Sequence, residues 1–90
     1  MNILVADDEV ISNRLLCRVL QDWGHKTISV PDGIKALEIL ESYDPPDLAI
    51  LDWTMPGMDG PEVCRRARMF PHGRNCVEFE GRVPASLNEI

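Results

Sequence analysis

Three aspartates follow apolar segments that have the character of buried β-strands. Asp7 and Asp8 come directly after residues 3–6, and Asp52 follows residues 48–51. Because parallel strands present their carboxyl ends at one edge of a sheet, where ligand sites of open α/β sheets form, we expect the three carboxylates to converge. Converging carboxylates repel each other unless a cation neutralises them, and a hard divalent cation such as Mg²⁺ takes oxygen ligands of this kind. One carboxylate can then act as a nucleophile, since aspartyl phosphates are a known class of covalent intermediate.

The elements that must position these aspartates alternate between strand and helix patterns, which indicates βαβ units and a parallel sheet. The predicted strands are residues 3–6, 25–30 and 48–51. The predicted helices are residues 9–23, 34–43 and 61–70, which are followed by Gly24, Pro45 and Pro71 respectively. In this interpretation Trp23 belongs to the core.

The segments ILVADDE (3–9) and LAILDWTMPGMDG (48–60), with their order and spacing, resemble response-regulator receiver domains of two-component signalling. The resemblance covers residues 1 to about 70 and implies a flavodoxin-like α/β fold, a parallel sheet with flanking helices. It implies that Asp52 accepts a phosphoryl group, that Asp8 binds Mg²⁺ directly, and that Asp7 holds the metal mainly through water. The main-chain carbonyl of Thr54 would complete the protein ligands. The implied phosphoryl donor is a phosphohistidine on a sensor histidine kinase or a phosphotransfer protein.

Residues 71–90 depart from the family pattern. We therefore divide the chain into an incomplete receiver-like domain of about three βα units, residues 1–70, and an atypical tail, residues 71–90, with a weak strand pattern at 77–80. The family's later strands carry a Ser or Thr that binds the phosphoryl group and a Lys that neutralises one of its oxygens. Here the only lysines, Lys26 and Lys35, precede Asp52, which predicts slower phosphoryl transfer. Unrelated sequence in place of the receiver's second half is favoured over a divergent end with another role.

Two functions remain open at this point. The first is a phospho-acceptor signalling domain, rather than an enzyme, and the retained acids and the MPGMDG turn favour it. The second is a receiver remnant that acts only as an interaction or oligomerisation module, which the absence of the Ser or Thr and the Lys favours. The tail has little apolar periodicity, so a strand edge and an apolar face are left uncovered. This predicts a homodimer or higher oligomer through the exposed sheet edge.

Composition narrows the partners and the compartment. Ninety residues are enough for one small domain, and the formal charge of -6 argues against direct nucleic-acid binding and against attraction to an anionic membrane. No run approaches the roughly eighteen apolar residues of a membrane span, and Met1 leads straight into a strand, so we expect a cytoplasmic protein. The three cysteines are odd in number and widely spaced, which indicates reduced thiols rather than disulfides or a zinc site.

Several of these residues also have structural interpretations. Asp7 and Asp8 are candidates for the amino-terminal cap of the next helix, Asp52 for a strand-ending turn, and Asp59 for a helix start. Trp53 either flanks the acidic site or covers the sheet edge. The arginines after Asp52 are interpreted as a solvated helix face rather than a docking patch: Arg65, Arg66, Arg68 and Arg74. No catalytic role is assigned to His25 or His72.

Overall fold

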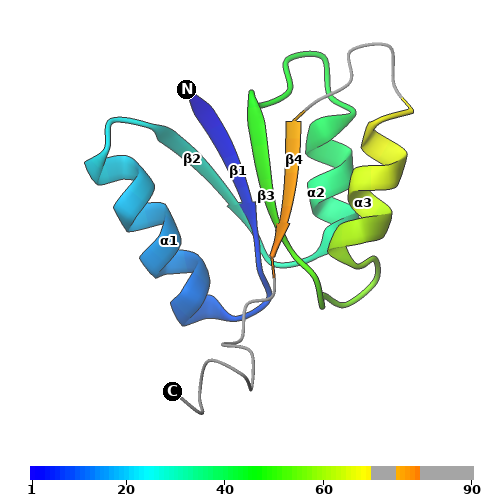
Figure 1. Ribbon diagram of the computed structural model, residues 1–90, viewed down its shortest axis with the longest axis horizontal. Coiled ribbons are helices and arrows are strands. Elements are labelled where there is room, and N and C mark those ends of the chain that lie inside the picture. The colour runs from blue at the N-terminus through cyan, green and yellow to red at the C-terminus, as the bar shows by residue number, and fades with distance from the viewer. Residues whose placement is uncertain (70–74, 80–90) are drawn as a thin grey trace.

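The structure is a computed structural model that describes residues 1–69 and the backbone of the strand at 75–79 (Figure 1). Strands and helices alternate along the described chain. In order, the elements are β1 (Asn2–Ala6), α1 (Val10–Asp22), β2 (Lys26–Val30), α2 (Gly33–Leu40), β3 (Leu48–Asp52), α3 (Gly60–Ala67) and β4 (Asn75–Phe79).

The strands form one parallel sheet in the order β2-β1-β3-β4. Ala6, the last residue of β1, is paired with Val30, the last residue of β2, and with Leu51 of β3, so the three strands end within one residue of one another. Asp7, which follows β1, and Asp52, the last residue of β3, therefore lie at the same edge of the sheet.

Helices cover both faces of the sheet, with α1 on one side and α2 and α3 on the other (Figure 1). Side chains of a strand point alternately to the two faces, and β1 is buried on both. Leu4 and Ala6 pack with the α2 and α3 side, whereas Ile3 and Val5 pack with Cys17 and Leu20 of α1. The flavodoxin-like α/β architecture predicted from the sequence is confirmed.

Several details of the sequence prediction are wrong, among them the end of the third helix, which lies at Ala67 and not at residue 70. Trp23 does not lie in the core: it follows the last residue of α1 and is 71% exposed, because its place in the helical repeat is on the side away from the sheet. The second helix ends at Leu40 rather than at residue 43, since the hydroxyl and the amide of Ser42 both bond to the carbonyl of Ile39 and close the helix. Tyr43 is fully exposed as a result.

A fourth strand lies where the sequence carried only a weak strand pattern. β4 begins at Asn75, two residues before the predicted segment, and pairs in parallel with β3 from Leu48 to Asp52. It covers the outer edge of β3, so β2 and β4 are the outer strands of the described sheet. The predictions for Phe70, His72, Arg74 and residues 80–90 lie outside the described residues.

Candidate functional site

The carboxylates of Asp7, Asp8 and Asp52 meet at the carboxyl edge of the sheet. Each offers an oxygen, and these oxygens all lie within 4.8 Å of one another. Asp7 and Asp8 follow the end of β1, and Asp52 is the last residue of the neighbouring β3. The convergence that the two sequence segments predicted is therefore present in the fold.

Burial distinguishes the three aspartates. Asp7 and Asp52 are only 2% and 6% exposed, whereas Asp8 faces solvent. Asp7 Oδ1 accepts a hydrogen bond of 2.9 Å from the Glu9 amide. Asp7 Oδ2 is also buried, and no described N–H or O–H group donates to it. A buried carboxylate oxygen without a donor is costly, so this oxygen is suited to a cation.

The surroundings of Asp7 raise the pKa of its carboxyl group from 3.8 to about 6. Burial is the main cause, because it disfavours the charged form, and the nearby Asp52 and Asp8 carboxylates add to it. The Glu9 amide acts in the opposite direction by stabilising the charged form. A proton on the Asp7 carboxyl would relieve part of its repulsion from the neighbouring carboxylates, and a divalent cation would relieve more of it.

Asp52 is held by the turn that follows β3. The Thr54 amide lies 3.4 Å from Asp52 Oδ1, and the Gly60 amide donates to the carbonyl of Trp53 at 3.3 Å. Gly57 has a φ of 80°, a backbone conformation that glycine adopts readily. Asp59 caps α3, since its side chain accepts from the Glu62 amide at 2.9 Å. The structural interpretation of Asp59 is thus confirmed.

The alternative in which Asp7 or Asp8 caps the first helix is wrong. Glu9 is the cap of α1, and its side chain accepts from the Ile11 amide at 3.2 Å. The two aspartates therefore remain directed to the acidic edge. Trp53 is 46% exposed beside Asp52, which is compatible with either of its two interpretations.

Sequence reasoning missed Asn13, which is 5% exposed. Its side-chain amide donates to the main-chain carbonyls of Asp7 and Val30, at 3.1 and 3.2 Å, and its Oδ1 accepts from the Ser29 hydroxyl at 2.6 Å. Asn13 thereby joins α1 to the carboxyl ends of β1 and β2. The available signal was a polar residue in the same helical row as the buried Cys17.

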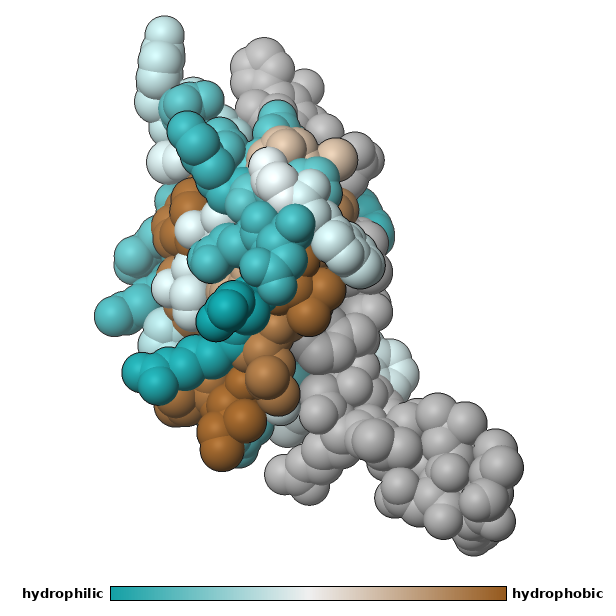
Figure 2. Space-filling view, turned by 90° about the vertical axis from the view of Figure 1, so that its left-hand side faces the viewer, coloured by the Kyte–Doolittle hydropathy of each residue, from teal (hydrophilic) through white to brown (hydrophobic). Residues whose placement is uncertain are grey.

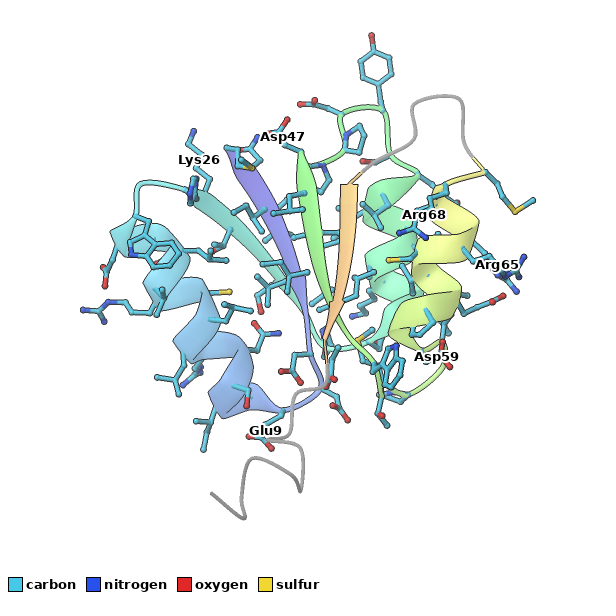
Figure 3. All side chains as sticks on the ribbon, viewed as in Figure 1. Glu9, Lys26, Asp47, Asp59, Arg65 and Arg68 are labelled. Carbon is cyan, nitrogen blue, oxygen red and sulfur yellow. The ribbon has the colours of Figure 1, made fainter. Side chains whose placement is uncertain are left out.

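Basic side chains lie mostly away from the acidic edge in the described residues. Lys26 begins β2 at the opposite edge of the sheet, and Arg65 points outward from α3 (Figure 3). Arg68, the residue after α3, is exposed. Arg65 and Arg66 both pair with Glu62. These hydrogen bonds lower the pKa of Glu62 to about 2, and the bond from Arg65 contributes most. The exposure of these arginines agrees with a solvated helix face. Arg14 is an exception, since it lines a pocket of about 140 Å³ beside Asp7 and Asp8.

Comparison with known proteins shows the family. The family of the response regulator receiver domain matches residues 3–78, and the chain belongs to it. The chain is 37% identical over 68 residues to sporulation initiation phosphotransferase F of Bacillus subtilis, covering 76% of this chain and 54% of that protein. It is 43% identical over 68 residues to the response regulator MprA of Mycobacterium avium, covering 76% and 29%. The chain thus spans about half or less of these relatives.

Solved structures agree with this assignment. The N-terminal domain of a response regulator receiver protein from Methanoculleus marisnigri is 32% identical with a TM-score of 0.79, covering 98% of this chain and 74% of that one. The receiver domain of the hybrid histidine kinase CckA is 26% identical with a TM-score of 0.75, covering 99% and 94%. The receiver domain of PA1611 from Pseudomonas aeruginosa, described with magnesium in its active site cleft, is 19% identical with a TM-score of 0.77, covering 98% and 91%.

Among the described residues, no helix is both long enough and apolar enough to cross a membrane. Cys17 and Cys64 are both buried.

Proposed function

We propose that this chain is a phospho-acceptor receiver domain in which Asp52 takes a phosphoryl group and Asp7, Asp8 and Asp52 hold Mg²⁺, with the main-chain carbonyl of Thr54 as a further ligand. The observation that carries the proposal is the convergence of three carboxylates within 4.8 Å, two of them buried. Asp7 Oδ2 is buried and no described group donates a hydrogen bond to it. A bound cation would therefore offset the cost of burying this oxygen.

In the proposed reaction an oxygen of the Asp52 carboxylate attacks the phosphorus of a phosphohistidine. The new bond joins that oxygen to phosphorus, the nitrogen–phosphorus bond breaks, and the imidazole leaves with the electron pair. Magnesium, when bound, would supply positive charge to the phosphoryl oxygens. The chain itself contributes position: β3 and the turn after it hold Asp52, and the end of β1 holds Asp7 and Asp8 beside it.

The proposed partner is a sensor histidine kinase or a phosphotransfer protein, because such proteins supply the phosphohistidine. The proposed role is that of a signalling domain and not of an enzyme, without direct contact to nucleic acid. The proposed location is the cytoplasm. Homodimers or higher oligomers through the outer edge of the sheet stay a prediction.

A second candidate is a receiver remnant that binds partners without switching. The observation in its favour is that these 90 residues contain no lysine after Asp52, so no lysine of this sequence occupies the family's charge-neutralising position. Since phosphoryl transfer depends on charge neutralisation, the two candidates differ in whether Asp52 is phosphorylated at all.

The deciding experiment is incubation of the chain with Mg²⁺ and either acetyl phosphate or a phosphorylated kinase, followed by intact mass measurement. We expect one phosphoryl adduct on the native chain and none on Asp52→Asn. Circular dichroism of both chains establishes that they are folded. A folded native chain that takes up no phosphoryl group from either donor would contradict the proposal. The second candidate, a receiver remnant that binds partners without switching, would then be favoured.

A further inference from the structure

The loop between β3 and α3, residues 53–59, contains an unusual turn. The Met58 amide donates to the Pro56 carbonyl at 2.9 Å, and Gly57 between them has a φ of 80°. A hydrogen bond between residues two apart, across a positive φ, defines the rarer and more strained form of γ-turn. Strained backbone persists only where the surrounding structure holds it. The contacts of this turn with the rest of the fold therefore decide whether it forms.

The first turn of α2 lies directly against the γ-turn. A Cβ placed on Gly33, the first residue of α2, would overlap the Met58 carbonyl oxygen and lie 2.7 Å from the carbonyl carbon. A Cβ placed on Gly57 would lie 2.7 Å from Cδ1 of Ile34. Carbon atoms that are not bonded to each other normally stay about 3.5 Å or more apart. Gly33 and Gly57 are thus two positions at which α2 and the loop approach too closely for a further carbon atom.

Thr54 lies in the segment of the loop between two fixed points. The side chain that follows it, Met55, is buried in the core, and Met58 is seated against α2. Among the described residues no backbone amide donates to the Thr54 carbonyl. Its direction is set by the chain on either side, which has nearly rigid peptide units. A displacement of Met58 would therefore be transmitted to this carbonyl.

We propose that Gly33 and Ile34 are positioning residues for the magnesium site. They hold the γ-turn, and through it the Thr54 carbonyl, where a cation bound by the aspartates can reach that oxygen. The inference rests on the proposed function, because it concerns the same site. Helix α2 contributes no ligand, yet it determines the affinity for magnesium.

A purely structural role is the alternative, in which the contact only packs α2 against the loop. Ile34 is 49% exposed and lies outside the hydrophobic core, so its contact with Gly57 adds little buried area. In the structural alternative, a variant of this contact that remains folded would bind magnesium as the native chain does. Magnesium affinity in folded variants therefore separates the two roles.

The test compares Gly33→Ala with a variant that loses stability elsewhere. The matched control is Leu20→Ala, which removes buried volume. Leu20 packs beneath α1, the helix on the side of the molecule that Figure 2 shows, whereas α2 and α3 cover the other face of the sheet (Figure 1). Magnesium is titrated by Trp53 fluorescence in a Trp23→Phe background, at a temperature where circular dichroism shows each variant to be folded.

We expect the magnesium dissociation constant to rise at least about tenfold in Gly33→Ala, the usual effect of disturbing a group that orients a metal ligand. In Leu20→Ala it should change less than about twofold. Phosphoryl uptake from acetyl phosphate, read by intact mass, should fall in Gly33→Ala at limiting magnesium. At saturating magnesium it should return to within about threefold of the native rate, because Asp52 itself is held by β3.

The pair of Gly57 and Ile34 gives a second test, which also applies if Gly33→Ala does not fold. Gly57→Ala should weaken magnesium binding, since the new Cβ meets Cδ1 of Ile34 and the φ of 80° becomes strained. Adding Ile34→Val deletes that Cδ1 atom. The double variant should then bind magnesium at least about threefold more tightly than Gly57→Ala, a coupling that a double-mutant cycle measures.

Native magnesium affinity in folded Gly33→Ala would overturn the proposal and leave the proposed function intact. An equal loss of affinity in Leu20→Ala would overturn it as well, and so would a double variant that binds no better than Gly57→Ala. Failure of the proposed function is a different result, in which the native chain itself neither binds magnesium nor takes up a phosphoryl group.

Discussion

Gly60, the first residue of α3, packs directly against the main chain of Asp52. A Cβ placed on Gly60 would lie 2.4 Å from the Asp52 carbonyl oxygen and 3.0 Å from the carbonyl carbon. Real Cβ atoms do not approach a backbone oxygen so closely, so only glycine allows α3 to begin here. The position of the proposed acceptor therefore depends on the absence of a side chain eight residues later.

Gly60→Ala is expected to destabilise the fold by about 1 to 3 kcal/mol, the usual cost of forcing extra volume into a packed site. Because the displaced group is the backbone of Asp52, phosphoryl uptake should fall as well. Urea unfolding and intact mass measure the two effects. Gly24→Ala is the control: its Cβ would meet nothing within 4 Å, although its φ of 93° adds strain, and phosphoryl uptake should be unchanged. Equal loss of uptake in both variants would contradict the explanation.

The sequence was sufficient for the order of elements because each strand and helix has its own local signal. Residues 3–6 and 48–51 are short apolar runs, and Gly24 and Pro61 mark a helix end and a helix start. Helix ends were less accurate, since the Ser42 hydroxyl that closes α2 acts through a contact that periodicity does not contain. Trp23 was misplaced because an apolar residue in a helical repeat was taken as buried, whereas α1 is apolar on both sides.

The raised pKa of Asp7 predicts a pH dependence of stability in the absence of divalent metal. In the folded chain this carboxyl has a pKa of about 6 against 3.8 without the fold, so the folded state binds the proton more tightly. The contribution of Asp7 to the free energy of unfolding should be largest below about pH 3.8 and should fall as the pH rises to about 6. The loss should be on the order of 2 to 3 kcal/mol.

Asp7→Asn removes this titration, and it should be more stable than the native chain at neutral pH. Urea unfolding in the presence of a chelator, over a series of pH values, makes the comparison. Asp44→Asn, which changes an exposed aspartate, should follow the native profile. If the native chain and Asp7→Asn have the same pH profile, Asp7 is not the group responsible.

Magnesium is expected to change the fluorescence of Trp53, which is half-exposed and adjacent to Asp52. In a Trp23→Phe background Trp53 is the sole tryptophan. Titration should reach saturation, and Asp8→Ala should weaken the apparent affinity at least about tenfold. At a magnesium concentration about 100 times the dissociation constant, the metal should add about 2.7 kcal/mol to stability. Identical titrations of the native chain and Asp8→Ala would reject the metal site.

The candidate site was predictable as far as it lies in the two strand-end segments. Asp7, Asp8 and Asp52 could be placed together because parallel strands end at one edge. The bonds that fix that edge were not predictable, since they join residues of different elements: Asn13 of α1 contacts the ends of β1 and β2 through its side chain alone. A polar residue in an apolar helical row indicates that its side chain makes a buried hydrogen bond. The sequence does not identify the residue at the other end of that bond.

Asn13→Ala should therefore affect both the fold and the acidic edge. The change removes two hydrogen bonds to the carbonyls of Asp7 and Val30 and leaves the Ser29 hydroxyl without its acceptor. Buried groups that lose their partners make this expensive, about 2 to 4 kcal/mol in the free energy of unfolding. Ser29→Ala deletes only one of these bonds, so it should cost about 0.5 to 1.5 kcal/mol.

The effect on the acidic edge is separable from stability. Asn13 holds the main chain of Asp7 and not its carboxylate, so magnesium affinity should fall in Asn13→Ala while Ser29→Ala stays close to native. Both titrations are made at a temperature where circular dichroism shows the variants to be fully folded. If folded Asn13→Ala binds magnesium as the native chain does, Asn13 stabilises the packing of α1 on the sheet without positioning the aspartates.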